Sequence, residues 1–112
     1  MTKINDEGTK HDQGKVPLHL LSPVALIQIA QVLGHGEQVY GTYNWLKGMH
    51  WSRIIGATLR HLFSWMRGHD KDPETGFSHL AHAGCCIMFL LEYEARGLGT
   101  DDRYKEEANG SS

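Results

Sequence analysis

One segment constrains the fold of this chain more than any other. The residues from Ala81 to Leu91 are apolar on nearly every side and include no Asp, Glu, Lys or Arg. A helix of this composition lies at the centre of a bundle or in an interface between protomers. We expect it to run from Phe77 to Ala95, with Ser78 or Thr75 as its N-cap and Gly97 at its end.

Two further helices are predicted from apolar residues at helical spacing. The first runs from Pro23 to Leu33, begins after the N-cap Ser22, and is expected to stop at Gly34 and Gly36. The second runs from Ser52 to Arg67. The sequence has no alternating run of β-branched residues that is long enough for a strand. The predicted fold class is therefore all-α, a small bundle of about three main helices.

A length of 112 residues suits one domain. We expect a flexible arm over residues 1–16, a single helical domain over residues 17–96, and a mobile polar tail over residues 97–112. Three helices make a thin core, and burial of the apolar helix between protomers would stabilise it. The prediction is a homo-oligomer, a dimer or higher, formed through that central helix.

Composition and charge limit the classes of partner that this chain can bind. The net charge is −2, which argues against nucleic acid, and no apolar run approaches the length of a membrane span. The N-terminus lacks the apolar stretch of a secretory signal, and the two cysteines, Cys85 and Cys86, are adjacent. These features predict a cytoplasmic protein without a membrane partner. Eight histidines are the compositional anomaly.

Histidines on the third predicted helix are candidate site residues. His79, His82 and Cys86 are spaced to share one helix face, and imidazole and thiolate both bind zinc-like metals. Asp70 and Asp72 precede them in the connecting loop, where a carboxylate either binds Mg²⁺ or forms a turn. The alternative for the histidines is a structural one, in which they are hydrogen-bonded at a helix interface.

A second group of residues suits phosphate. Arg53 and Arg60, with Arg67, are seven residues apart and share a face of the second predicted helix. Guanidinium groups bind phosphate oxygens in pairs and keep their charge. His61 would approach the histidines of the next helix in an antiparallel pair, and Lys15 would reach a phosphate from the arm. The alternative is a solvated face with carboxylate partners.

The segment between the first two predicted helices is a candidate base-binding loop. Tyr40 and Trp45 offer aromatic faces and Asn44 offers an amide that can bind a purine edge. Alternatively, Trp45 and Tyr40 close the end of the bundle. The sequence does not decide between the two.

Five segments fall in an order that is typical of a known family. They are Lys15 to Leu26, Tyr40 to Gly48, Leu59 to Leu62, Asp72 to Gly76 and His79 to Ala83, within roughly residues 12–93. On these segments the chain resembles the phage-borne dATP/dGTP diphosphohydrolases, which lie near the MazG-like, all-α nucleoside triphosphate pyrophosphohydrolases. The resemblance implies an all-helical oligomer in the infected bacterial host that binds purine nucleotides, cuts between the α- and β-phosphates and uses Mg²⁺ or Mn²⁺.

Two functions stay open at this point, with a purely structural protein as a third. In the enzyme, His79, His82 and Asp72 are catalytic, and Asp70 joins these three as a metal ligand. However, the sequence has no Asp or Glu from Gln38 through His69, where MazG-like enzymes would place metal-binding carboxylates. The alternative is therefore a protein without a cofactor that sequesters a cyclic nucleotide or an ADP-ribose-type signal to counter host defence.

Overall fold

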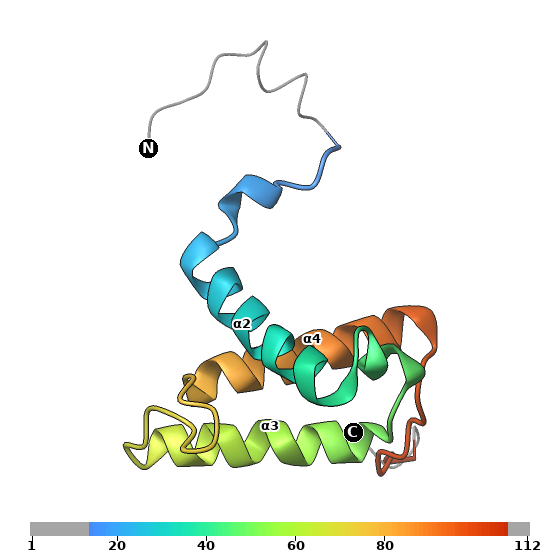
Figure 1. The fold of residues 1–112 in the computed structure, drawn as a ribbon. Helices are drawn as coiled ribbons and strands as arrows, with labels where there is room; N and C mark the ends of the chain where they lie inside the picture. The colour runs from blue at the N-terminus through green and yellow to red at the C-terminus, as the bar shows by residue number, and fades with distance from the viewer. Residues whose placement is uncertain (1–13, 108–112) are drawn as a thin grey trace.

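Three α-helices dominate the computed structural model, which describes residues 14–107 (Figure 1). Over that range no strand forms, and the β-type pairing consists of two isolated bridges, His50 with Thr100 and Lys71 with Ser78. The predicted all-α class with three main helices is confirmed. In chain order the elements are η1 (Leu18–Leu20), α2 (Pro23–Tyr40), η2 (Asn44–Lys47), α3 (Trp51–Met66) and α4 (His79–Arg96), where η denotes a 3-10 turn.

The central position of α4 agrees with its apolar sequence. Helix α4 packs against α3 on one side and against α2 on the other, so it lies between them. The hydrophobic core joins Val32 of α2 to Ala81 and Cys85 of α4. Gly84 lets α2 come close, because a Cβ at this position would lie 2.9 Å from Cδ1 of Ile29. The caps follow the prediction: the Ser78 side chain accepts from the N–H of Leu80, and Gly97 ends α4 in a left-handed conformation.

The predicted end of the first helix is wrong. Gly34 and Gly36 do not stop α2, which continues to Tyr40 and ends at Gly41, where φ is 96°. A glycine inside a helix costs only about 1 kcal/mol relative to alanine, and continued backbone hydrogen bonds together with packing of Val32 against α4 offset that cost. Gly41 ends the helix because it adopts a positive φ.

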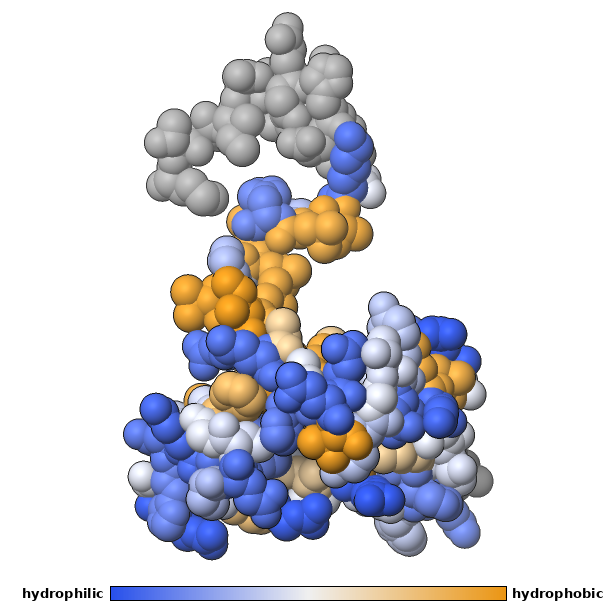
Figure 2. Space-filling model, in the orientation of Figure 1, coloured by the Kyte–Doolittle hydropathy of each residue, from blue (hydrophilic) through white to orange (hydrophobic). Residues whose placement is uncertain are grey.

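The N-terminal half of α2 and the segment before it carry exposed apolar side chains. In Figure 1 this part of the chain extends away from α3 and α4, and Figure 2 shows hydrophobic residues along it. Leu18, Leu20 and Val24 are each at least 68% exposed. Such a row of exposed apolar residues is typical of a surface that packs against another chain or segment. Residues 1–13 of the predicted arm and 108–112 of the predicted tail lie outside the described residues.

In the described residues, no helix is both long enough and apolar enough to cross a membrane.

Candidate functional site

The loop between α3 and α4 positions an aspartate at the mouth of the helix pair. The N–H of Asp72 donates to the carbonyl of Phe77 at 2.8 Å, and the N–H of Gly76 donates back to the carbonyl of Asp72 at 2.8 Å. Oδ1 of Asp72 accepts from the N–H groups of Glu74 and Thr75 at 2.8 and 3.2 Å. This is an Asx-type turn, so one carboxylate oxygen holds the loop while the other stays available.

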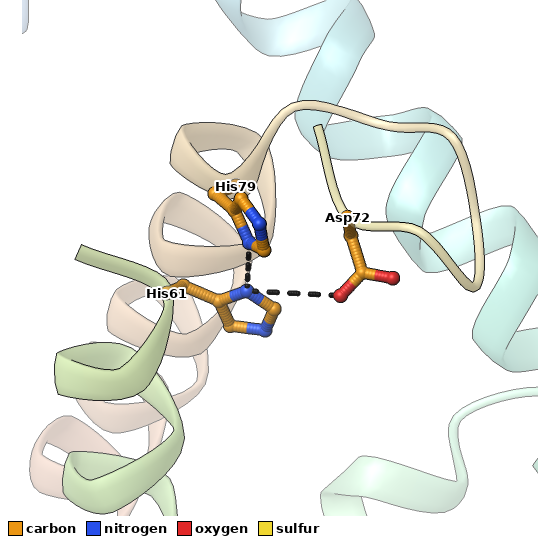
Figure 3. Close-up of side chains that lie close together, drawn as sticks. All are labelled: His61, Asp72 and His79. Atoms are coloured by element: carbon orange, nitrogen blue, oxygen red, sulfur yellow. Dashed lines mark hydrogen bonds and ion pairs between the residues drawn. The ribbon is translucent and has the colours of Figure 1, made fainter. Parts of the chain in front are cut away.

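His61, Asp72 and His79 meet where α3, this loop and α4 converge (Figure 3), and His82 lies beside them. Nδ1 of His61 on α3 lies 2.9 Å from Nδ1 of His79 on α4. The same Nδ1 lies 4.0 Å from Oδ2 of Asp72. The ring of His82 stacks on His61 with centroids 4.6 Å apart and an interplanar angle of 9°. Its Nε2 contacts Oγ1 of Thr75 at 2.7 Å. We call His61, Asp72, His79 and His82 the histidine cluster.

Burial tunes the charge of this cluster. Burial, reinforced by the nearby His82 and His79, lowers the pKa of His61, although Asp72 opposes the shift. Burial likewise lowers the pKa of His82. Burial raises the pKa of Asp72, but its backbone hydrogen bonds to Glu74 and Thr75, together with the charges of His82 and His61, bring it below the usual value. Near neutral pH these shifts favour neutral imidazoles at His61 and His82 beside an ionised Asp72, the forms that bind metals and accept protons.

The predicted metal ligands divide between two places. Asp72 and His79 lie in one group of possible ligands with His61, whose ligand atoms are all within 4.8 Å of one another. Asp70 contributes its backbone carbonyl, which accepts from the N–H of His79 at 2.9 Å. His82 is engaged with Thr75 and with the ring of His61. The sequence placed His61 among phosphate contacts, and the structure brings it into the group of possible ligands.

The arginines predicted to bind phosphate are exposed on α3. Arg60 directly precedes His61, and its charge is one of the influences that lower the pKa of His61. Helix α3 contains no Asp or Glu, and no ion pair within residues 14–107 involves Arg53 or Arg60. Lys15 is exposed in the segment that precedes η1, and Figure 1 shows that this segment extends away from α3 and α4.

The aromatic loop packs against the bundle. The Trp45 ring stacks on Phe89 of α4 with centroids 4.6 Å apart. The backbone carbonyl of Trp45 accepts a hydrogen bond of 2.6 Å from the hydroxyl of Tyr93, which is fully buried. Tyr40 is 71% exposed, and Asn44 is half-buried at the start of η2. The geometry therefore gives Trp45 a packing role and leaves Tyr40 free for a ligand.

The sequence predicted that Cys86 shares a helix face with His79 and His82. Among the described residues, Cys86 is not part of the group of possible metal ligands. Burial raises the pKa of Cys86 and raises that of Cys85 to about 12. Both thiols stay protonated near neutral pH, so neither is activated as a nucleophile.

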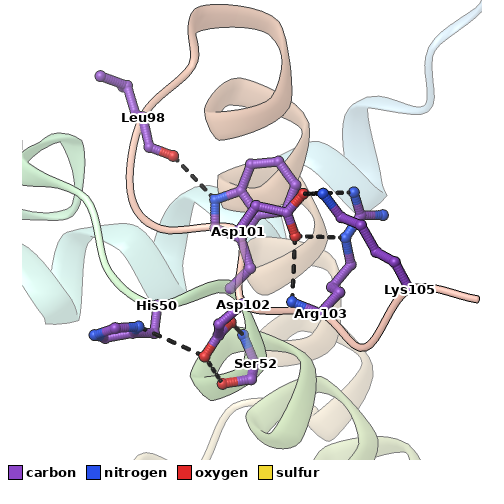
Figure 4. A network of polar contacts seen from close by, with 8 residues as sticks. His50, Ser52, Leu98, Asp101, Asp102, Arg103 and Lys105 are labelled. Carbon is purple, nitrogen blue, oxygen red and sulfur yellow. Dashed lines mark hydrogen bonds and ion pairs between the residues drawn. The ribbon is translucent and has the colours of Figure 1, made fainter.

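A polar network that sequence reasoning missed holds the C-terminal segment (Figure 4). Oδ1 of Asp102 accepts from the N–H of Ser52 at 2.8 Å, in the first turn of α3, and Oδ2 accepts from the Ser52 hydroxyl. The backbone of Thr100 pairs with Met49 and Trp51. The expectation of a mobile tail counted apolar area only, whereas these contacts are polar. The one sequence signal was the Asp101–Asp102 pair, whose carboxylates suit an exposed helix N-terminus.

The fold and the cluster together define a class: a small all-α protein with a mixed histidine and carboxylate site beside a cationic helix. Comparison with known proteins makes this specific. The chain belongs to the family described as dATP/dGTP diphosphohydrolase, N-terminal, whose model matches residues 5–103. The resemblance inferred from the sequence is thereby confirmed.

A curated relative supports the same family. The chain is 41% identical over 96 residues to a protein of Salmonella phage PMBT28 that is named dATP/dGTP diphosphohydrolase. The match covers 86% of this chain but only 33% of that protein. The chain thus spans about a third of the length of the relative it matches. No solved structure matches the chain.

Proposed function

We propose that this chain acts in the hydrolysis of purine deoxynucleoside triphosphates, in which water attacks the α-phosphorus and pyrophosphate leaves. The products are a deoxynucleoside monophosphate and pyrophosphate. The observation that carries the proposal is the histidine cluster beside the cationic face of α3, in a chain whose family and phage relative bear the name dATP/dGTP diphosphohydrolase.

The proposal assigns phosphate binding to the arginines. Arg60 and Arg53 would bind the phosphate oxygens, because both are exposed and their guanidinium groups keep their charge. Lys15 is assigned to the same ligand, from the arm of the same or a neighbouring protomer. Tyr40 and Asn44 would contact the base, whereas Trp45 holds the loop on which they lie.

His82 is the proposed proton acceptor. Burial lowers the pKa of its imidazole, and the contact of Nε2 with Oγ1 of Thr75 fixes its orientation. In the tautomer in which Nε2–H donates to Thr75, Nδ1 would take the proton of the attacking water, which is worth typically 10²–10⁴-fold in rate. His79 and Asp72, the other proposed catalytic residues, would hold a divalent cation such as Mg²⁺ or Mn²⁺. When bound, such a cation neutralises phosphate charge and lowers the pKa of water.

The proposed setting is the cytoplasm of an infected bacterium. A nucleoside triphosphate is available there, and the phage source of the relative agrees with that setting. The proposal includes assembly of the chain into a homo-oligomer, which would cover the exposed apolar residues of α2 and α4.

The test is a nucleotide assay with the intact chain. We expect dATP or dGTP, incubated with Mn²⁺ or Mg²⁺, to yield the monophosphate and pyrophosphate over many turnovers, as measured by HPLC, and a chelator to stop the reaction. His82→Ala should lower kcat by about 10²-fold or more. Arg96→Ala is the matched control, because Arg96 pairs with Glu92 and lies outside the proposed site.

Each part of the proposal has an outcome that would refute it. Full activity of His82→Ala would refute the assignment of His82 as the base. Recovery of a nucleotide intact from the denatured protein, without any turnover, would show sequestration in place of hydrolysis.

A further inference from the structure

We propose that His61, Asp72 and His79 form a centre for one borderline first-row divalent ion, such as Co²⁺ or Zn²⁺, which they bind in preference to Mg²⁺. The inference deepens the proposed function, on which the ion's role toward phosphate rests. Binding of the ion itself is independent of that function.

The spacing of the donor atoms carries the proposal. Nδ1 of His61 is 2.9 Å from Nδ1 of His79 and 4.0 Å from Oδ2 of Asp72, and the three residues each offer a ligand atom within 4.8 Å of those of the other two. Donors that share an ion at about 2.1 Å lie about 3–4 Å apart, depending on the angle between them. The three atoms therefore need only a small inward movement to surround one ion.

The loop leaves one oxygen of Asp72 free for the ion. Oδ1 is taken by the N–H groups of Glu74 and Thr75, whereas Oδ2 faces His61 (Figure 3). The turn thus fixes the carboxylate in the direction of the two imidazoles. An ordinary loop aspartate that served only the turn would not need to face a pair of histidines from two different helices.

The facing nitrogens also favour a cation between them. At 2.9 Å one Nδ1 must donate and the other must accept, so the two rings need different tautomers. An ion takes the lone pairs of both nitrogens at once. His82 helps to fix the orientation of His61, because the His82 ring stacks on His61 and its own Nε2 contacts Thr75. Such supporting contacts orient the first ligands of metal sites.

The donor types decide which ion is bound. Mg²⁺ prefers a shell of six oxygens, many of them from water, and imidazole nitrogen is a poor ligand for it. Two imidazoles and one carboxylate suit borderline ions such as Co²⁺ or Zn²⁺. The side chains of His61 and Asp72 are 20% and 17% exposed, so an ion can enter from solvent. Three protein ligands leave positions open for water or phosphate oxygen.

The test measures metal binding to the full chain without any nucleotide. We expect isothermal titration with Co²⁺ to give one site per chain, with a visible absorption band that reports nitrogen and oxygen ligands, and Mg²⁺ to bind at least 10-fold more weakly. Asp72→Asn keeps an acceptor for the turn but loses the charge, and should weaken Co²⁺ binding about 10–100-fold. His61→Ala should do the same. His69→Ala, an exposed histidine of the same loop, is the control and should bind as the parent chain does.

The outcomes separate the two proposals. Unchanged Co²⁺ binding in both Asp72→Asn and His61→Ala, or equal affinity for Mg²⁺, would overturn the metal centre even if the chain hydrolyses nucleotides. Co²⁺ binding that depends on these two residues would support the centre even if no nucleotide is hydrolysed. Thermal unfolding of each metal-free variant shows whether it is folded. If His61→Ala is not folded, the Co²⁺ affinity of Asp72→Asn, which retains the turn, decides whether the metal centre exists.

Discussion

The hydroxyl of Tyr93 offers a sharp test of how the aromatic loop is held. Tyr93 is fully buried on α4, and its hydroxyl donates a hydrogen bond of 2.6 Å to the backbone carbonyl of Trp45. Tyr93→Phe removes one oxygen atom, keeps the ring, and leaves that carbonyl with the N–H of Gly48, at 3.2 Å, as its donor. The substitution therefore isolates a single contact between α4 and the loop that carries Asn44.

The expected loss of stability is that of one hydrogen bond. The Trp45 carbonyl keeps the N–H of Gly48 as a donor, so no acceptor is left unpaired. The net contribution of one such hydrogen bond is about 0.5–1.5 kcal/mol, which is the loss that we expect. In a domain of this size, that corresponds to a fall in Tm of about 2–8 °C.

The measurement is thermal and urea unfolding followed by circular dichroism, at one protein concentration so that any oligomer affects all samples equally. Tyr104→Phe is the matched control, because Tyr104 is 90% exposed and should leave Tm unchanged. If Tyr93→Phe is as stable as the parent chain, the hydroxyl does not tie the loop to α4. The packing role assigned to Trp45 would then rest on its stacking with Phe89 alone.

Four further predictions use other parts of the chain. Trp45→Ala should lower Tm because the stacking on Phe89 is lost. At a temperature where the variant is folded, the ratio of its affinities for dGTP and dCTP should equal that of the parent chain, and a selective loss of dGTP affinity would show that the ring binds the base. Hydrogen bonds from Ser52 lower the pKa of Asp102 below its ordinary 3.8, so the carboxylate stabilises the fold above that pH and loses this effect as the pH falls below it. In urea unfolding from pH 6 to pH 3, Asp102→Asn should therefore reduce the fall in the free energy of unfolding with pH, and an unchanged fall would contradict the contact. Gly99→Ala should cost more stability than Gly97→Ala in the same assay, because both positions have positive φ but only at Gly99 would a Cβ contact the carbonyl of Met49. Light scattering should show that the parent chain is a dimer or larger oligomer. Ile87→Asp, in an apolar groove between α3 and α4, should give monomers, whereas the control Lys105→Ala should not. A monomeric parent chain would refute the proposed interface.

The helices could be predicted because their signals are local. The cap of α4 at Ser78, its end at Gly97 and the apolar residues of α3 are each read from a few neighbouring positions, and the structure confirms them. The end of α2 could not be predicted in the same way. Whether Gly34 ends a helix depends on the packing of Val32 and Leu33 against α4, which is a contact between distant parts of the sequence.

The C-terminal segment was missed for a related reason. Its contacts are polar and join positions about fifty residues apart, as between Ser52 and Asp102. Apolar area, which is the usual basis for predicting order, takes no account of a carboxylate that caps a helix elsewhere in the chain. Arg103, which lies 5.0 Å from the centre of the Trp51 ring, adds a cation–π contact that spacing alone does not reveal.

For the candidate site, sequence spacing identified part of the set. His79 and His82 share a face of α4, and Asp72 lies in the preceding loop, so their proximity was predictable. His61 belongs to another helix, and its approach to His79 depends on the antiparallel pairing of α3 with α4 and on the length of the loop. The sequence predicted that approach only as a consequence of such pairing. The structure adds which atoms face each other, and these atoms decide the chemistry.

That chemistry resolves an apparent conflict in the sequence. Between Gln38 and His69 the chain lacks the carboxylates that hold Mg²⁺ in MazG-like enzymes, which argues against metal-assisted hydrolysis if Mg²⁺ is the ion. The argument weakens if the ion is a borderline one, because imidazole nitrogens replace carboxylate oxygens as ligands. A centre made of His61, Asp72 and His79 would need only the single carboxylate that the loop supplies. The affinity ratio of Co²⁺ to Mg²⁺ then decides whether the chain has such a centre, and turnover of the nucleotide separately decides between hydrolysis and sequestration.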